Sequence, residues 1–297
     1  MSNSQVQIMK WVACLFVVLL NGCSNVYELA FVSDRNGQSD IYLTDINGKE
    51  VRQLTQTKDV EYGLTWTSDG TEIYYTLFLP EGRQVGRLVV ADGKTSTVLN
   101  DSTLVSLCDV SRNKKKLLVA SRIHHAKGEL YVYDIPTQTY TRLTDNDFFE
   151  AGAKFSPDET SVVAAIQTQK PGPNHPAGMA EIFRIELSSL TPVQLTHMHA
   201  FNGLPDWSPD GSQIAFHSCN QGKCDVYVME VDGSGLTNIT AGKEDNRWPR
   251  WTPDGKWIAF TKSTDGNSDI WFASPDGATL KPIITSPGRD EIAECKP

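Results

Sequence analysis

Short runs of alternating apolar and polar residues recur along the chain at a regular interval. The stretch Trp207–Phe216, W-S-P-D-G-S-Q-I-A-F, returns 44 residues later as Trp251–Phe260, W-T-P-D-G-K-W-I-A-F. The Pro-Asp-Gly triplet in each copy has the composition of a tight turn, and the β-branched and aromatic residues that flank it favour strands. The pattern therefore predicts an antiparallel hairpin in each copy.

A second pair of strands follows this hairpin. After Phe216 comes the β-rich run Asp225–Met229, then a Gly-rich turn at Asp232–Gly235, then the pair Ile239-Thr240. One repeat thus contains four antiparallel strands, named A to D in chain order, and it needs neighbouring copies to bury its apolar faces. Four such strands per repeat are typical of a propeller blade.

The repeats can be aligned on the residue that ends each A strand. These residues are separated by 44, 45, 52, 44 and 44 positions, and they are Trp66, Val110, Phe155, Trp207, Trp251 and Cys295. Nine residues after them lie the B-strand positions Tyr75, Val119, Ala164, Phe216 and Phe260. Strand C begins near an acidic residue in every copy except the one that has Arg87 there; the acidic residues are Asp40, Glu129, Glu181, Asp225 and Asp269. Because these acidic residues recur, we assign them to the scaffold and not to a site.

The sixth copy is divided between the two ends of the chain. Cys295-Lys296-Pro297 matches the start of the Trp251 copy, and if Asn25 is counted as following Pro297, Phe31 falls nine residues after Cys295. We therefore predict an all-β fold, a six-bladed β-propeller of four-stranded antiparallel blades. Pairing of the C-terminal strand with the N-terminal strands would close the ring.

The first 22 residues do not follow the repeat. Lys10 precedes an apolar run, Trp11–Leu20, that has the length of a signal-peptide core and is short for a membrane-spanning helix. The next residues, Leu20-Asn21-Gly22-Cys23, resemble a bacterial lipobox, which implies cleavage before Cys23 and lipidation of that cysteine; an ordinary secretory signal is the alternative. We expect a lipoprotein signal peptide at 1–22 and one propeller domain at 23–297, with translation starting at Met1 or at Met9.

The charge of the chain argues against a nucleic-acid partner. Its 27 Lys and Arg against 36 Asp and Glu give a net charge of −9, and loss of Lys10 with the signal peptide makes the charge more negative still. Phosphate backbones are bound by basic faces, which this composition does not favour.

The repeat motif W-[ST]-P-D-G, I-A-F, G-x-x-D-[IV]-[YW] and L-T resembles that of TolB-like, or WD-like, β-propellers across essentially all of residues 25–297. In TolB itself an α/β domain precedes the propeller, whereas here only the expected signal peptide does. The resemblance implies a propeller of the bacterial cell envelope. Ser24, which follows Cys23, resembles an outer-membrane sorting residue, so we expect a lipid anchor on the periplasmic side of the outer membrane.

Two features break the repeat. The B–C connection of the fourth copy, residues 167–178, is eight residues longer than in other copies and rich in Pro and Gly; it is either a functional surface loop or a tolerated insertion. The histidines are also clustered, because all six lie between positions 124 and 217. Five of them fall on B–C or D–A connections, which share one rim of a propeller, and form our candidate ligand rim: His124, His125, His175, His197 and His199.

His197-Met198-His199 would aim two imidazoles to one side if the chain were extended there, as metal ligands require. A resemblance to oligogalacturonate lyases, propellers with a His-bound metal in the channel, implies an alternative function as a metal-assisted polysaccharide lyase or hydrolase. Since no third ligand of matching register is evident, we predict no metal and no cofactor. We assign no catalytic residue, because the motifs G-x-S-x-G, H-E-x-x-H and C-x-x-C do not occur.

Four cysteines remain besides Cys23 and the one in the signal peptide. Cys219 and Cys224 flank Asn-Gln-Gly-Lys at a hairpin mouth, so we predict a disulfide between them in an oxidising compartment. Cys108 and Cys295 fall on A strands of separate copies and are predicted to be buried, unpaired thiols.

Together these features favour a non-enzymatic binding or scaffold lipoprotein, a monomer that receives a peptide, protein or glycan at the mouth of the propeller channel. Only Ser24 separates Cys23 from the A–B turn position Asn25, so the A–B face should lie against the membrane. The rim that carries His175, His197 and His199 would then point into the periplasm.

Overall fold

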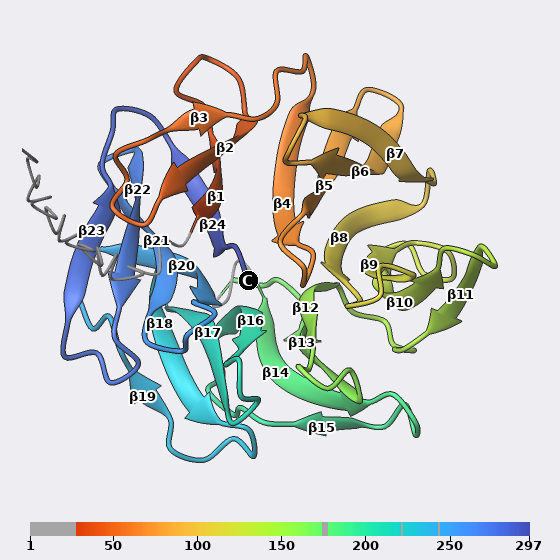
Figure 1. Cartoon of the computed structure of the whole chain (residues 1–297). Helices are drawn as coiled ribbons and strands as arrows, with labels where there is room; N and C mark the ends of the chain where they lie inside the picture. Colours follow the sequence, from red (N-terminus) through yellow and green to blue (C-terminus); the bar gives the residue numbers. More distant parts are fainter. Residues whose placement is uncertain (1–27, 174–177, 221, 243) are drawn as a thin grey trace, which may run out of the picture.

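The computed structural model describes residues 28–173, 178–220, 222–242 and 244–297 (Figure 1). The expected signal peptide, Cys23 and His175 lie outside these residues. Within them the regular elements are 24 strands and no helix, so the fold is all-β. No helix in this part of the chain is long and apolar enough to cross a membrane.

The strands form four-stranded antiparallel units arranged as a propeller, and each unit contains one strand of each kind, A to D. The A strands are β4 (Val60–Trp66), β8 (Leu104–Val110), β12 (Glu150–Phe155), β16 (Phe201–Trp207), β20 (Asp245–Trp251) and β24 (Asp290–Cys295). The B strands are β5 (Glu72–Leu79), β9 (Lys116–Ser121), β13 (Ser161–Gln169), β17 (Gln213–Asn220), β21 (Ile258–Thr264) and β1 (Glu28–Ser33). The C strands are β6 (Gly82–Val89), β10 (Glu129–Asp134), β14 (Met179–Glu186), β18 (Lys223–Glu230), β22 (Asn267–Ala273) and β2 (Asp40–Asp45). The D strands are β7 (Lys94–Asn100), β11 (Thr139–Arg142), β15 (Pro192–Gln194), β19 (Thr237–Asn238), β23 (Leu280–Ile284) and β3 (Arg52–Gln53).

Hydrogen bonds group the described strands into five sheets. Four sheets have four strands each, in the orders β24-β1-β2-β3, β4-β5-β6-β7, β11-β10-β9-β8 and β20-β21-β22-β23. The fifth contains β12–β19 and is joined in its middle by one parallel pair, Ala180 with Phe201. All other pairings within it are antiparallel.

The six residues on which the sequence repeats were aligned end the six A strands. Each A strand contacts the A strand of the next unit, from β4 through β8, β12, β16 and β20 to β24, and β24 contacts β4. Figure 1 shows these strands nearest the middle of the molecule. The A strands therefore surround the centre of the propeller.

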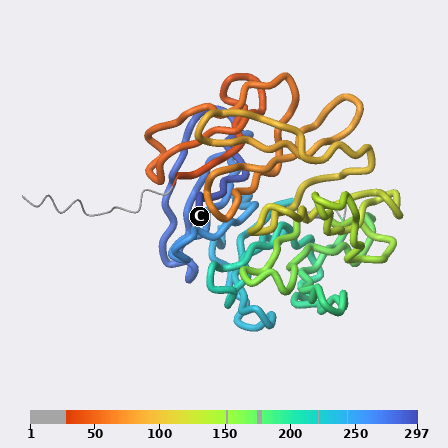
Figure 2. The backbone as a smooth tube through the Cα atoms, turned by 45° about the vertical axis from the view of Figure 1, so that its right-hand side comes forward, coloured from red at the N-terminus to blue at the C-terminus, as the bar shows by residue number. Residues whose placement is uncertain are grey.

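The C-terminal strand lies in the same sheet as the first described strand. β24 pairs antiparallel with β1, with Leu29 opposite Cys295 and Ala30 opposite Glu294. Beyond the strand, the Lys296 amide donates to the Glu28 carbonyl over 2.7 Å. The turned view in Figure 2 shows this blue segment running beside the red N-terminal strands.

The core lies between the faces of neighbouring sheets. In one cluster Val226 and Val228 of β18 pack with Trp251, Ile258 and Phe260 of the next unit, and all five side chains are buried. Burial of apolar surface contributes roughly 25 cal/mol per Å² to folding, so each sheet is stabilised chiefly by its neighbours.

The recurrent aspartates of the Pro-Asp-Gly turns hold the A–B turns together. Asp210 accepts hydrogen bonds from the Ser208 hydroxyl over 2.6 Å and from the Ser212 amide over 3.0 Å. Gly211 follows with a φ of 74°, a left-handed conformation that residues with a side chain rarely adopt.

The long connection of the fourth repeat is shorter than the sequence predicts. Strand β13 continues to Gln169, and Gln167 pairs with Ala180 and Gln169 with Met179 across the hairpin. The backbone ladder thus extends three residues into the segment expected to be loop, and it ends just before Pro171, which has no amide hydrogen to donate.

Candidate functional site

A cavity of about 400 Å³ lies among the A strands, on the side of the B–C and D–A connections. Its aromatic lining comes from several sheets and consists of Tyr62, Phe78, Phe149, Phe201 and Trp248. Small-molecule and peptide side-chain sites typically occupy about 300–1,000 Å³ and have such a mostly apolar lining.

A recurrent backbone feature positions part of this lining. Three residues before its end, each A strand contributes one lining residue; the six are Gly63, Leu107, Gly152, Leu204, Trp248 and Ile292. Five of them have positive φ, including the three non-glycine residues Leu204 (45°), Trp248 (57°) and Ile292 (54°). This conformation costs about 1–3 kcal/mol at residues with a side chain and persists where the surroundings enforce it. It interrupts the ladder with the B strand and frees these residues to face the cavity.

The aromatic residues at one side of the cavity form a connected wall. The Tyr62 ring meets the Phe78 ring edge to face at 6.0 Å and the Trp248 ring edge to face at 6.5 Å between centroids. Tyr62 is 36% exposed and Phe149 is 38% exposed, and they are the two aromatic residues among the exposed large apolar side chains of the described residues. Exposed aromatic rings around a concavity are typical of a binding site.

The charged groups that line the cavity are all cationic. They are Arg83, Arg247 and Arg250, and the lining includes no Asp or Glu within the described residues. The Arg83 guanidinium lies 4.4 Å from the centre of the Phe78 ring and donates to the Val105 carbonyl. Burial and the nearby charge of Arg122 lower the pKa of Arg83. Arg247 donates from Nε to both carboxylate oxygens of Asp245, over 2.8 and 2.9 Å.

His217 also lines the cavity and is kept neutral by its surroundings. It is 3% exposed, and burial together with the charges of Arg247 and Arg250 lowers its pKa to about 3. Its Nδ1 has no hydrogen-bond partner within the described part of the chain. A Cβ on Gly203 would lie 2.8 Å from the imidazole ring, so glycine is needed for this close approach.

Beneath the cavity lies a layer of polar side chains, each one residue before the end of an A strand. We call it the charged layer; its members are Thr65, Asp109, Lys154, Asp206, Arg250 and Glu294. Lys154 reaches from β12 to three other A strands, with Nζ 2.9 Å from Thr65 Oγ1, 3.1 Å from Glu294 Oε2 and 3.4 Å from Asp109 Oδ1. Arg250 Nε lies 3.5 Å from Glu294 Oε2. These bonds cross the space between the A strands and floor the cavity.

The carboxylates of the charged layer also join neighbouring units. Asp109 accepts from the Phe155 amide (3.0 Å), Asp206 from the Trp251 amide (2.7 Å) and Glu294 from the Trp66 amide (3.0 Å). Burial raises the pKa of Asp109, and it raises that of Asp206 to about 6 against the opposing charges of Arg250 and Lys154. The layer is therefore a structural element of the fold.

The four described histidines of the candidate ligand rim do not line the cavity. His124 Nδ1 lies 2.9 Å from the Tyr131 hydroxyl, and His125 Nε2 lies 2.5 Å from Asp147 Oδ1. Both histidines thus interact within the third repeat and its connection to the fourth.

The segment His197-Met198-His199 is not extended, contrary to the sequence-based expectation. His199 has a φ of 52°, and its amide donates to Glu181 Oε1 over 2.8 Å, while His197 Nδ1 lies 3.0 Å from Gln194 Nε2. Glu181, the scaffold carboxylate near the start of strand C, thus holds the backbone of this segment in a turned conformation. No group of three or more His, Cys, Asp or Glu with the geometry of a metal site occurs among residues 28–173, 178–220, 222–242 and 244–297.

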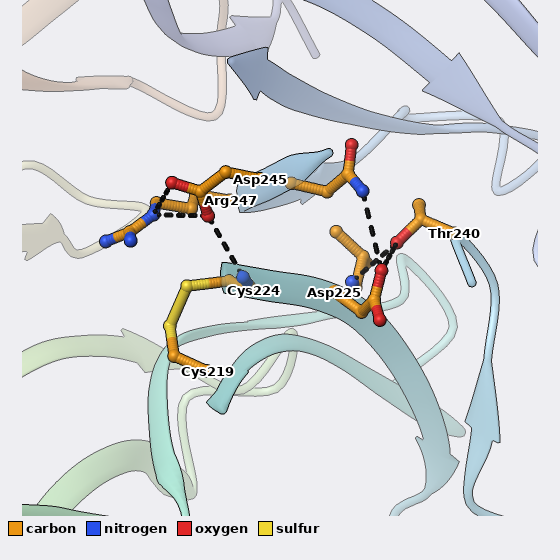
Figure 3. The surroundings of a disulfide bond; sticks show 8 residues. Cys219, Cys224, Asp225, Thr240, Asp245 and Arg247 are labelled. Atoms are coloured by element: carbon orange, nitrogen blue, oxygen red, sulfur yellow. Dashed lines mark hydrogen bonds and ion pairs between the residues drawn. A yellow bond between two sulfur atoms is a disulfide. The ribbon is translucent and has the colours of Figure 1, made fainter. Parts of the chain in front are cut away.

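Cys219 and Cys224 are joined by a disulfide at the mouth of the β17–β18 hairpin (Figure 3). The Cys224 amide donates to Asp245 Oδ1 over 3.0 Å, and Asp245 in turn binds Arg247. Asp245 therefore connects the disulfide to Arg247 in the lining of the cavity. Cys108 and Cys295 are free thiols; Cys295 is buried as expected, but Cys108 is only half-buried and lines the cavity.

Sequence reasoning missed Arg83, Arg247 and His217, which come from three sheets and share no motif. The charged layer carried a usable signal, because the residue before each aligned A-strand end is charged or a threonine in all six copies. Polar residues that recur at one aligned position of otherwise apolar strands indicate that these positions share a polar environment.

Comparison with protein-family models matches residues 82–297 to the TolB beta propeller domain. An uncharacterized protein of Agrobacterium fabrum is 26% identical over 209 residues, which is 68% of this chain and 66% of that protein. The Tol-Pal system protein TolB of Francisella tularensis is 27% identical over 199 residues, 65% of this chain and 43% of that protein. The chain thus aligns with less than two thirds of the length of these relatives.

Among solved structures, TolB from Acinetobacter baumannii superposes with a TM-score of 0.80 at 17% identity, covering 92% of this chain and 69% of that one. An oligogalacturonate lyase in complex with manganese superposes with a TM-score of 0.59 at 15% identity, covering 89% of this chain and 75% of that one. At these identities the likeness is one of fold.

Proposed function

The chain belongs to the family of TolB β-propeller domains, and from that membership we propose that it is a non-enzymatic binding protein of the cell envelope. In this proposal a peptide or protein partner enters the cavity among the A strands. A glycan is the other ligand class that the sequence leaves open.

The cavity is the observation that carries this proposal. It combines exposed aromatic rings, which supply apolar contact area, with guanidinium groups, which supply directed hydrogen bonds. Residues of these two kinds dominate the energetics of protein interfaces. The described lining contains no carboxylate, so it lacks the pair of acids that most glycoside hydrolases use.

We further propose that the propeller is a closed ring of six blades. Two observations support it. Among the described residues, the Ala180–Phe201 bridge is the one strand pairing between β12–β15 and β16–β19, and β24 pairs with β1 while contacting β4. In this interpretation the eight-strand sheet is two adjacent blades, and the sheet of β24 and β1–β3 is the blade that joins the two ends of the chain.

The cellular location is part of the same proposal. A signal peptide at 1–22 and lipidation at Cys23 would anchor the protein on the periplasmic side of the outer membrane, as a monomer. The relative from Francisella tularensis is named Tol-Pal system protein TolB, and this likeness supports an envelope location for the present chain. With Cys23 next to the first A–B turn, the A–B face would lie towards the membrane and the cavity would open into the periplasm.

The alternative, a metal-assisted polysaccharide lyase or hydrolase, is supported by the fold shared with oligogalacturonate lyase. The four described rim histidines do not converge on the cavity, and this favours the binding function.

Site-specific cross-linking in cells tests the binding function. A photoreactive phenylalanine replaces Phe149 at the cavity, and in a matched control it replaces Leu280, which is 46% exposed on strand β23. We expect illumination to join an envelope protein or peptide to position 149 and not to position 280. Equal cross-linking at both positions, or none at 149, would contradict the proposal.

A further inference from the structure

The cavity is open at one end only. Its floor is the charged layer, in which Lys154 bridges β12 to β4, β8 and β24. A polypeptide therefore cannot thread through the channel. An internal segment would have to enter and leave by the same mouth, whereas a chain end needs to enter only once, and about 400 Å³ suits a small ligand or a few side chains.

The charge of the lining favours one kind of chain end. Arg250 pairs with Glu294 in the floor, and Arg247 pairs with Asp245 through Nε, which leaves its terminal nitrogens out of that ion pair. Arg83 forms no ion pair within the described part of the chain. The terminal nitrogens of Arg83 and Arg247 are the donors best placed to receive an anion. The lining is cationic although the chain as a whole has a net charge of −9.

These two arginines approach the same aromatic wall. Arg83 stacks on Phe78, Phe78 meets Tyr62, and Tyr62 meets Trp248, the residue that follows Arg247. Both arginines line the same cavity as this wall, so a ligand with an apolar side chain against the wall would place an adjacent anion within a cationic lining. Arginine binds carboxylates through two parallel hydrogen bonds, which makes it the preferred residue for such recognition.

We infer that the cavity binds the free C-terminal end of a peptide chain, with an apolar last side chain against Tyr62 and Trp248 and the α-carboxylate at Arg83 and Arg247. This inference rests on the proposed binding function and specifies its ligand. An N-terminal ammonium is disfavoured because the described lining offers cations and no carboxylate.

Paired peptide libraries test the inference. The intact protein is incubated with N-terminally labelled pentapeptides that carry every combination of the last two residues, made once as free acids and once as C-terminal amides. We expect enrichment of free acids that end in Leu, Ile, Val or Phe, with the amides of the same sequences binding at least about tenfold more weakly, since a charge-assisted hydrogen bond is lost. Equal recovery of acids and amides, or recovery of neither, would overturn the inference.

Variants of Arg83 and Arg247 test whether these two residues bind the α-carboxylate of the ligand. Arg83→Gln and Arg247→Gln should each weaken binding of the best free acid by about tenfold and leave its amide unchanged. Arg289→Gln is the control, because Arg289 lies outside the cavity and is 62% exposed in its pair with Asp34. An equal loss in all three variants, or none in the first two, contradicts the assignment; circular dichroism verifies that each variant folds.

The cross-linking experiment separates this inference from the function on which it depends. If mass spectrometry shows that position 149 is cross-linked to an internal segment of a partner, the binding function stands and the end-specific inference fails. A cross-link in the last few residues of the partner supports both.

Discussion

The charged layer and the cavity above it are built by nearby residues of the same six A strands, but their charged side chains differ in how fully they are paired within the fold. In the layer, Lys154 contacts two carboxylates and a hydroxyl, and each carboxylate also accepts an amide from the next strand. In the cavity, Arg83 has a ring and one carbonyl as its partners and no carboxylate within the described residues. Charges of the first kind have partners within the fold, whereas those of the second kind have capacity left for a ligand.

The difference shows how a repeated strand can hold both scaffold and site. Buried ions require partners, because removing a charge from water costs several kcal/mol, so the position before each strand end is occupied by groups that satisfy one another. Two residues earlier the left-handed backbone interrupts the pairing, and the chain there presents side chains to open space. Variants of the charged layer should therefore lower stability, whereas variants of the cavity should chiefly weaken ligand binding.

Lys154→Met should have the largest effect on folding. It leaves Asp109 buried without its cation and Glu294 with Arg250 as its remaining cation, and the unfolding free energy should fall by about 3–5 kcal/mol. Chemical denaturation measures this change. Lys94→Met, at an exposed lysine that pairs with Asp92, is the control and should leave the denaturation midpoint in place. Similar losses in the two variants would remove the distinction between the layer and the surface.

His217→Gln should change how stability depends on pH. The folded protein holds the pKa of His217 at about 3, below the ordinary value of 6.5, so the unfolded chain takes up a proton first as the pH falls. The contribution of His217 is complete above pH 6.5 and is lost on acidification, by about 3 kcal/mol at pH 4. The variant lacks this loss, so its stability should decline less steeply between pH 6.5 and 4 in denaturation series.

Asp206 acts in the opposite direction over part of the same range. Its pKa is raised to about 6, so the folded state takes up a proton there before the unfolded chain does, and stability rises as the pH falls from 6 towards 4. For this reason the test compares wild type and variant at each pH. His197→Gln, at an exposed histidine outside the cavity, is the control; a change of slope in that variant alone would refute the assignment to His217.

Replacing Cys219 and Cys224 by serine should have a smaller effect. The loop that the disulfide closes is short, so the loss of unfolding free energy should be about 1–2 kcal/mol. Since the Cys224 amide contacts Asp245, which orients Arg247, binding of a carboxylate ligand should also weaken. Reduced wild-type protein should match the variant, and non-reduced peptide mapping should recover the linked pair. Free thiols at both positions in periplasmic material would contradict the disulfide.

Arg83→Gln should have the smallest effect on stability. Arg83 makes no ion pair within the described residues, so its replacement removes the contact with Phe78 and the hydrogen bond to Val105. The unfolding free energy should therefore fall by only about 1 kcal/mol. The same denaturation series as for Lys154→Met measures it. A loss as large as that of Lys154→Met would mean that Arg83 belongs to the scaffold.

The regular part of the fold could be predicted because it is encoded locally and repeated. The six aligned positions end the A strands, and a turn held by Asp210 forms where the Pro-Asp-Gly triplet predicts one. Departures came where a contact distant in sequence overrides local preference. Glu181 binds the His199 amide across 18 residues and turns a segment that was expected to be extended, and cross-strand pairing of Gln167 draws part of a Pro-rich loop into a hairpin.

The cavity could not be predicted from local patterns. Arg83 lies on a B–C hairpin, His217 on a B strand and Arg247 on an A strand, in three different repeats. Their convergence depends on the distance between A strands across the channel and on the left-handed residues that interrupt them. Neither quantity has a signature in the hydrophobic pattern.

The pairing of β24 with β1 has a consequence for the order of folding. Leu29 lies opposite Cys295, so the sheet that contains the first described strand stays incomplete until residue 295 has been synthesised. Contacts with so large a separation in sequence close slowly, because the entropy of the intervening chain must be lost first. Throughout that interval β1 presents an open edge to which another extended chain can add. β24 emerges after every other described strand, and its arrival ends that period of vulnerability.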